Sequence, residues 1–154
     1  LGSLCREVEL MDREGKTHVL TQEQMDFSYR HSCLEETDWI VVSALLSLVP
    51  GKEEMIRARM KELQAKRLAS QPLNFPSAGS AFKRPQGGYA AALIDQAGLK
   101  GFRVGDAAIS EKHGGFAVNL GKATAEDMKT LLKEVSEKVE ARSGIHLEPE
   151  IRVW

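Results

Sequence analysis

The segment from Asn74 to Pro85, NFPSAGSAFKRP, constrains the fold of this chain more than any other stretch. Pro76 and Pro85 fix the backbone near its two ends, and Gly79 permits unusual torsion angles or a close ligand approach before Ser80. Such punctuation excludes a helix and predicts a loop. A turn leading into a strand is the common role of a segment like this. A loop that holds a small anion is the alternative, because a hydroxyl, an aromatic ring and two cations lie within six residues.

Helical patterns lie on both sides of this loop. Residues 52–69 have apolar side chains near one face and charged ones on the other, and residues 89–97 form a short alanine-rich stretch that ends at Gly98. The clearest helix is expected over residues 124–142. Its first residue is a threonine, and Asp127 stands three positions later, which is the spacing of a capping box.

Strand patterns complete the expected fold. We predict a hairpin from 6–11 and 17–20, a buried strand over 39–48, strands over 103–110 and 115–120, and a final strand over 150–154. The sequence therefore indicates an α+β protein, with a small antiparallel sheet and helices on one face in its second half. Because the residue before a proline leaves helical conformation, Gln71-Pro72 is the expected boundary between two lobes, 1–70 and 71–154.

Composition excludes several classes of function. The chain has 154 residues, 42% of them hydrophobic, which suits one ordinary domain or two small ones. Its net charge of −1 disfavours a nucleic-acid partner. The longest apolar run, Trp39–Val49, is shorter than the roughly 18 residues of a membrane span, so no membrane partner is expected. Cys5 and Cys33 lack the spacing of a zinc site, and we expect free thiols and no metal.

Several motifs occur in an order and spacing that point to one family. They are FSYRHS at 27–32, PSAGSAFKRP at 76–85, LID at 93–95 with GLKG at 98–101, residues 105–110, Gly115-Phe116, and EPEIRV at 148–153. Together they resemble UDP-N-acetylenolpyruvoylglucosamine reductase, the bacterial flavoenzyme of cell-wall precursor synthesis. The resemblance covers essentially the whole chain, but only the C-terminal part of the family's protein. The short run from Pro72 to Ser80 indicates the compact subclass, which lacks a tyrosine-bearing insertion.

The resemblance implies a cytoplasmic enzyme that reduces UDP-N-acetylglucosamine enolpyruvate with NADPH through bound FAD. Residues 1–70 would complete an FAD-binding lobe, and 71–154 would form the substrate-binding domain. The family's glycine-rich FAD-binding segments precede the first residue of this chain. We therefore expect a missing N-terminal FAD-binding half, no assignable cofactor residues here and little turnover by the chain alone.

The resemblance also implies three catalytic residues. Arg30, in a Tyr-Arg-X-Ser context, would grip the substrate carboxylate with two parallel hydrogen bonds. Ser80 would donate a proton to the carbon next to that carboxylate. Glu150 would polarise the carboxylate, and it would need a proton or the pairing of Arg30, because two carboxylates repel each other. Glu148 is expected on the same face as Glu150, so the choice between them rests on the family motif. Taken alone, each of the three also suits an ordinary structural role.

Three cations are candidate contacts for the substrate diphosphate: Lys83, Arg84 and Lys112. Some family members carry asparagine where this chain has Arg84, which weakens that assignment. An ordinary surface role is the alternative for all three. His113 and Asn119 also match family positions, and a structural role is expected for both.

Other functions remain as alternatives. A hydrolase triad of Ser80 with Asp106 and His113 is disfavoured, because no G-x-S-x-G elbow surrounds the serine. The GKAT sequence at 121–124 resembles the end of a phosphate-binding loop but has Phe116 where the first glycine would stand. A non-catalytic UDP-sugar binding module is the main rival. A protein-interaction domain that presents the helix at 52–69 is the third possibility.

Overall fold

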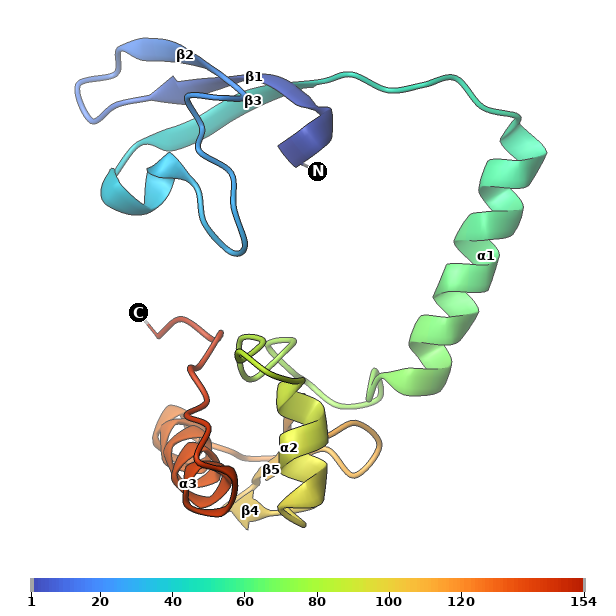
Figure 1. Cartoon of the computed structure of the whole chain (residues 1–154), viewed down its shortest axis with the longest axis vertical. Helices are drawn as coiled ribbons and strands as arrows, with labels where there is room; N and C mark the ends of the chain where they lie inside the picture. Colours follow the sequence, from blue (N-terminus) through green and yellow to red (C-terminus); the bar gives the residue numbers. More distant parts are fainter. Residues whose placement is uncertain (1, 154) are drawn as a thin grey trace. The chain divides into compact units, whose positions relative to one another are not determined.

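The computed structural model describes residues 2–153 and divides by packing into two compact units. The division falls between Met55 and Ile56, inside helix α1 (Glu53–Ser70). Figure 1 traces the chain from one unit to the other. The boundary expected at residue 70 concerns the lobes of a longer protein and stays a prediction.

The first unit is built on a three-stranded antiparallel sheet in the order β2-β1-β3 (Figure 1). Its strands are β1 (Cys5–Met11), β2 (Thr17–Thr21) and β3 (Ile40–Leu46), with short 3-10 helices at Gly2–Leu4 and Cys33–Glu36. The predicted hairpin is confirmed, because β1 pairs with β2 from Glu7↔Thr21 to Met11↔Thr17. The Asp12 carboxylate shapes its turn by accepting the N–H groups of Glu14 at 3.1 Å and Lys16 at 2.8 Å.

The first unit has a small core, which leaves β3 exposed. Four buried side chains make up this core: Cys5, Val8, Leu10 and Met25. Every residue of β3 is exposed, so the prediction of a buried strand is wrong. The reason is topological. Among the described residues β3 pairs with β1 alone, and too few side chains lie in this unit to cover the apolar ones that β3 carries.

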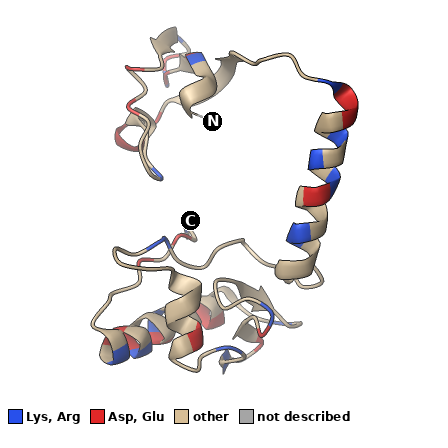
Figure 2. Cartoon of the chain, turned by 45° about the vertical axis from the view of Figure 1, so that its right-hand side comes forward, with Lys and Arg blue, Asp and Glu red and all other residues tan. Residues whose placement is uncertain are grey.

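Helix α1 follows the prediction in extent but has no buried residue among its 18. Its apolar side chains remain at least 49% exposed: Met55, Ile56, Met60, Leu63 and Leu68. Acidic and basic side chains are both present along it (Figure 2). Glu62 pairs with Arg59 at 2.7 Å and Lys66 at 2.6 Å, and such pairs one turn apart stabilise a helix modestly. Local interactions therefore account for most of the stability of this helix.

The second unit holds the larger core, formed by a small sheet and two helices. The sheet has the order β4-β5-β6, from β4 (Arg103–Val104), β5 (Ala107–Ile109) and β6 (Ala117–Asn119). Helix α3 (Ala125–Ser143) packs against β4 and β5, and α2 (Ala90–Gln96) packs against α3 (Figure 1). The core includes Ile94, Ile109, Leu131, Val135 and Leu147, which are all essentially inaccessible. The α+β class is confirmed.

The predicted capping box of α3 is confirmed. The Thr124 hydroxyl accepts the N–H of Asp127 at 3.1 Å, and the Asp127 carboxylate accepts the N–H of Thr124 at 2.8 Å. This hydrogen bond from the backbone of Thr124 lowers the pKa of Asp127. At the other end Gly144 has φ of +71°, which suits the left-handed cap that glycine adopts easily.

Two predicted strands are wrong. Residues 103–110 form a tight hairpin rather than one strand, because Gly105 turns the chain with φ of +56° and lets β5 fold back on β4. Residues 150–153 form no strand. Among the described residues, this segment meets the Ser80 loop through an isolated bridge between Pro149 and Phe82 and through two backbone hydrogen bonds beside it. Proline lacks an N–H and limits extended pairing of that segment. Within residues 2–153, none of the helices is both long and apolar enough to cross a membrane.

Candidate functional site

The loop that carries Ser80 is held along strand β6 by hydrogen bonds at its start. Asn119 donates its backbone N–H to the carbonyl of Pro76 at 2.9 Å. The Ser77 hydroxyl donates to the carbonyl of Ala117 at 2.7 Å and accepts the N–H of Gly79 at 3.2 Å. One serine side chain thus links the loop both to the sheet and to its own next turn.

Ser80 is exposed and lies between a glycine turn and two buried residues. Gly79 has φ of +92°, and no atom lies within 4 Å of the position that a β-carbon there would occupy. Ser80 forms an isolated bridge with Phe116, and the next two residues, Ala81 and Phe82, are buried in the core. The backbone of Ser80 is therefore fixed on its C-terminal side while its hydroxyl faces the outside.

The segment around Glu150 lies alongside this loop. Lys83 donates its N–H to the carbonyl of Glu148 at 2.8 Å, and Glu150 donates its N–H to the carbonyl of Ala81 at 2.9 Å. The two hydrogen bonds flank the bridge between Phe82 and Pro149. The structure thus brings together three predicted site residues from distant parts of the sequence: Ser80, Lys83 and Glu150.

The two nearby glutamates have different surroundings. The carboxylate of Glu148 forms an ion pair with the ammonium of Lys83 on the outside of the loop. Glu150 is half-buried and lies next to the residue that follows Ser80. The two glutamates therefore differ in exposure and in their backbone partners on the Ser80 loop, and the choice of Glu150 over Glu148 still rests on the family motif.

Arg84 lies at the end of the same loop. Its guanidinium carbon is 4.1 Å from the ring centre of Tyr89, and its Nε donates to the carbonyl of Gly88 at 3.3 Å. A cation over an aromatic face is held in place yet keeps donors at its edge. Arg84 therefore has a defined position beside Lys83 and Ser80.

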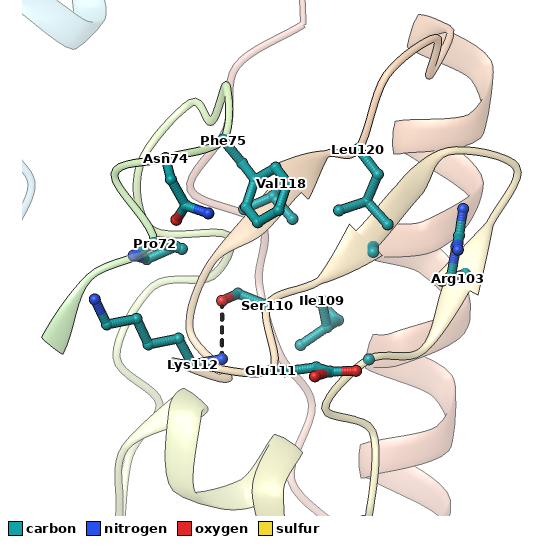
Figure 3. Close-up of a pocket in the computed structure, with 12 residues that line it drawn as sticks. Pro72, Asn74, Phe75, Arg103, Ile109, Ser110, Glu111, Lys112, Val118 and Leu120 are labelled. Carbon is teal, nitrogen blue, oxygen red and sulfur yellow. Dashed lines mark hydrogen bonds between the residues drawn. The ribbon is translucent and has the colours of Figure 1, made fainter.

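Lys112 lies elsewhere in the second unit. Its ammonium donates to the carbonyl of Leu68 at 2.7 Å, in the last turn of α1. Figure 3 shows Lys112 in a pocket of about 410 Å³, with Pro72, Phe75 and Val118 among its walls. Ser80 and the other predicted site residues do not line this pocket. The structure thus separates Lys112 from the loop cations with which the sequence grouped it.

Arg30 belongs to the first unit and lies at the tip of a tight turn. Ser28 and His31 exchange both backbone hydrogen bonds, at 3.2 and 3.4 Å, so that Tyr29 and Arg30 form the turn between them. Arg30 has φ of +57°, an uncommon conformation for a residue with a β-carbon. The guanidinium carbon lies 5.9 Å from the ring centre of Tyr29. Its exposed position on a strained turn is typical of a functional residue.

The hydrolase triad is not assembled. In a triad the imidazole Nδ1 faces the carboxylate, but here Nδ1 of His113 accepts the N–H of Gly115 at 3.1 Å. The Asp106 carboxylate is occupied by Arg103 at 3.1 Å and by the N–H of Lys122 at 2.9 Å. Over residues 2–153 there is also no group of three or more side chains arranged to hold a metal ion.

The GKAT segment does not form a phosphate cradle. The side-chain oxygen of Asn119 accepts the N–H groups of Gly121 at 2.9 Å and Ala123 at 3.0 Å, and Asp106 accepts that of Lys122. A phosphate-binding loop needs these N–H groups to point at the ligand. The structural role expected for Asn119 is consistent with these bonds.

Sequence analysis assigned no role to two serines that shape this region. One is Ser77, which anchors the loop. The other is Ser110, which is buried and whose hydroxyl accepts the N–H groups of Lys112 at 3.2 Å and His113 at 3.3 Å (Figure 3). A serine followed two or three residues later by a turn is a recognisable signal for this kind of bond. The long-range partner of Ser77 leaves no such local signal.

Comparisons with known proteins agree on one family. The sequence model described as "UDP-N-acetylenolpyruvoylglucosamine reductase, C-terminal domain" matches residues 71–154. A protein of that enzyme name from Agathobacter rectalis is 48% identical over 144 residues, which cover 94% of this chain and 46% of the relative. One from Caldanaerobacter subterraneus subsp. tengcongensis is 46% identical, with 99% of this chain and 51% of the relative covered.

A solved structure gives the same result. The crystal structure of UDP-N-acetylenolpyruvylglucosamine reductase from Thermus caldophilus superposes with a TM-score of 0.82 at 40% identity. The match covers 99% of this chain and 54% of that one. The chain spans about half the length of the curated relatives it matches. It belongs to the UDP-N-acetylenolpyruvoylglucosamine reductase family, as represented by that family's C-terminal domain.

Proposed function

We propose that this chain acts as the C-terminal portion of a longer cytoplasmic reductase. The complete enzyme would convert UDP-N-acetylenolpyruvoylglucosamine to UDP-N-acetylmuramate with NADPH and FAD in peptidoglycan precursor synthesis. The observation that carries the proposal is the pairing of the Ser80 loop with the Glu150 segment in a member of this family. The residues 71–154 would bind substrate, and residues 1–70 would complete the flavin-binding lobe.

The proposed chemistry assigns one task to each residue. When a hydride reaches the terminal carbon of the enolpyruvyl group, negative charge develops next to the substrate carboxylate. Arg30 would hold that carboxylate through two hydrogen bonds, and Glu150 would share in polarising it. Ser80 would give its hydroxyl proton to the adjacent carbon. A serine hydroxyl is a weak acid, so this donation requires a strongly basic carbon, which the reduced enolate-like group provides.

The diphosphate contacts are proposed for the cations at the end of the Ser80 loop. Arg84 is held over the ring of Tyr89, and Lys83 is paired with Glu148, so both cations have defined positions on this loop. Lys112 is a weaker candidate, because it donates to Leu68 in another pocket.

The described residues do not fit a complete FAD site. A dinucleotide pyrophosphate usually lies at a helix N-terminus that is free of negative charge. Helix α1 begins with Glu53 and Glu54, and α3 begins with Glu126 and Asp127, so both long helices disfavour a phosphate there. We therefore assign the pyrophosphate to the part of the longer protein outside this chain.

The test compares two neighbouring glutamates in a reductase of full family length that contains this chain. Glu150→Gln removes the proposed polarising carboxyl, and we expect kcat to fall by at least about 10²-fold. Glu148→Gln is the matched control, since it only removes an exposed ion pair with Lys83, and we expect less than about a threefold change. Steady-state NADPH oxidation with the enolpyruvyl substrate measures both.

Ser80 provides a second arm of the same experiment. Ser80→Ala should abolish turnover while the substrate still binds, because the change removes only a hydroxyl from an exposed position. Turnover by Ser80→Ala and Glu150→Gln equal to that of wild type would contradict the roles assigned to these two residues. No turnover by the wild type of full family length, with UDP-sugar binding intact, would instead favour the non-catalytic binding module.

A further inference from the structure

A histidine next to Arg30 stands between two carboxylates. Nδ1 of His31 lies 3.1 Å from the Oε2 atom of Glu35, and Nε2 lies 3.5 Å from the Oδ2 atom of Asp26. A neutral imidazole has one N–H and one lone pair, so one of its nitrogens would face a carboxylate oxygen with a lone pair. Only the imidazolium donates on both sides. The geometry therefore fits a charged His31.

These three residues surround the turn that carries Arg30. Asp26 precedes the turn and has a left-handed backbone with φ of +47°. Glu35 lies in the 3-10 helix that follows it. His31 closes the turn itself through its two backbone bonds to Ser28. The imidazole thus ties the two ends of the segment to the point where the Arg30 turn closes.

The base of the segment is fixed independently of this histidine. Cys33 donates its N–H to the carbonyl of Met25 at 2.9 Å, and Met25 is buried in the core of the first unit. Between these anchors the turn residues Tyr29 and Arg30 are exposed. Loss of the His31 contacts would therefore loosen the turn without unfolding the sheet.

We propose that His31 is a positioning residue, whose protonated ring clamps the Arg30 turn between Asp26 and Glu35 and makes carboxylate binding by Arg30 dependent on pH. This inference rests on the proposed function of Arg30. The charged groups that face the ring are the two carboxylates, and the Arg30 guanidinium is adjacent along the chain.

The direction of the pH dependence follows from the contacts. The hydrogen bond to Glu35, helped by that to Asp26, raises the pKa of His31. A histidine with a raised pKa in the folded state contributes order that is complete below its ordinary pKa. The order of the turn is lost as the pH rises through the raised pKa of His31. The turn should therefore be ordered in mildly acidic solution and looser in alkaline solution.

Nuclear magnetic resonance of the labelled 154-residue chain tests the clamp without any substrate. Over about pH 5.5 to 9 the His31 ring should titrate with a midpoint above about 6.5, the ordinary imidazole value. The heteronuclear NOEs of the Tyr29 and Arg30 amides should fall with the same midpoint. Glu35→Gln should move the midpoint down. If the heteronuclear NOEs of the Tyr29 and Arg30 amides do not change when His31 loses its proton, the proposal is wrong.

Three variants separate the clamp from general stability. His31→Gln should give a loose turn at every pH, and His31→Arg, which can donate to both carboxylates without titrating, should give an ordered turn throughout. His146→Gln is the control, because His146 pairs with one carboxylate among the described residues, that of Glu140 at 2.8 Å, and lies far from the Arg30 turn in the sequence. If His31→Gln does not fold, the Glu35→Gln and His31→Arg variants still test whether protonated His31 orders the turn.

The kinetic consequence is tested in the reductase of full family length. In wild type the KM for the enolpyruvyl substrate should rise several-fold across the His31 titration while kcat changes less, and in His31→Arg that rise should be absent. A KM that stays flat while the turn loosens would refute the positioning role. Turnover that survives Arg30→Ala would instead refute the proposed function, so the two failures can be told apart.

Discussion

At the scale of a single residue, Ser77 determines where the Ser80 loop lies, because its hydroxyl bonds both to Ala117 and to Gly79. We expect Ser77→Ala to lower the free energy of unfolding by about 1 kcal/mol, the usual net value of such a bond. Urea denaturation followed by circular dichroism measures the loss. Amide exchange at Gly79 and Ser80 should accelerate in the same variant.

A second serine serves as the control for Ser77→Ala. The hydroxyl of Ser70 donates to the carbonyl of Lys66 at 2.9 Å on an exposed helix end, where water can replace it. Ser70→Ala should therefore change the stability by less than about 0.5 kcal/mol. Equal effects of the two changes would show that the bond to Ala117 does not hold the loop.

Individual residues also show how far a sequence can predict such a site. The motif around Ser80 identified the loop, and the Thr124 capping box identified a helix start, because both depend on residues close in sequence. The pairing of Glu150 with Ala81 and the separation of Lys112 from Lys83 depend on tertiary packing. No local pattern carries that information.

At the scale of an element, α3 depends on the reciprocal bonds between Thr124 and Asp127 at its first turn. Thr124→Ala should destabilise the second unit by about 1 kcal/mol at neutral pH. Since the pKa of Asp127 is lowered on folding, the charged carboxylate stabilises the fold above its ordinary pKa of 3.8. That contribution is lost as the pH falls through the lower folded value.

Asp127→Asn isolates the charge in this cap. It should be less stable than wild type at neutral pH, and the difference should shrink as the solution is acidified below 3.8. Glu137→Gln, in the middle of the same helix and 3.9 Å from Lys133, is the control and should show little difference at either pH. Urea midpoints at the two pH values give the comparison, and a difference for Asp127→Asn that does not depend on pH would contradict the assignment.

Two elements show which properties of a strand the sequence pattern could not predict. Strand β3 has the composition of a buried strand, yet burial depends on what covers it, and the described residues leave it exposed. The stretch 103–110 is expected from the sequence to be one strand, but Gly105 folds it into a hairpin. In both segments the composition correctly predicts strand-forming residues. It does not predict how many other elements cover β3 or where residues 103–110 turn.

At the scale of the whole molecule, the two units have separate cores and the division between them falls in an exposed helix. Isolated helices of about this length are only marginally stable in water. We therefore expect trypsin to cut first within α1, at Arg57, Arg59, Lys61, Lys66 or Arg67. A fragment that contains residues 71–154 should persist. Mass spectrometry of a timed digest identifies the cuts, and first cleavage inside α3 would contradict this order.

The activity of the chain alone is also decided at this scale. Because the described residues offer no complete flavin site, the purified chain should oxidise NADPH no faster than a buffer blank. The absorbance spectrum with added FAD gives the matching binding measurement. A clear rate of NADPH oxidation by the chain alone would contradict this expectation and the division of labour proposed above.

The bridge between Phe82 and Pro149 can form only after the ribosome has synthesised both segments. The ion pair beside it joins residues 65 positions apart. At about 5–20 residues per second, a ribosome needs roughly 3–13 s to reach the second partner after the first. During that interval the loop cannot take its final position. A nascent chain interrupted before residue 148 would lack both the Lys83–Glu148 ion pair and the Phe82–Pro149 bridge, so the Ser80 loop would be held only by its hydrogen bonds to β6.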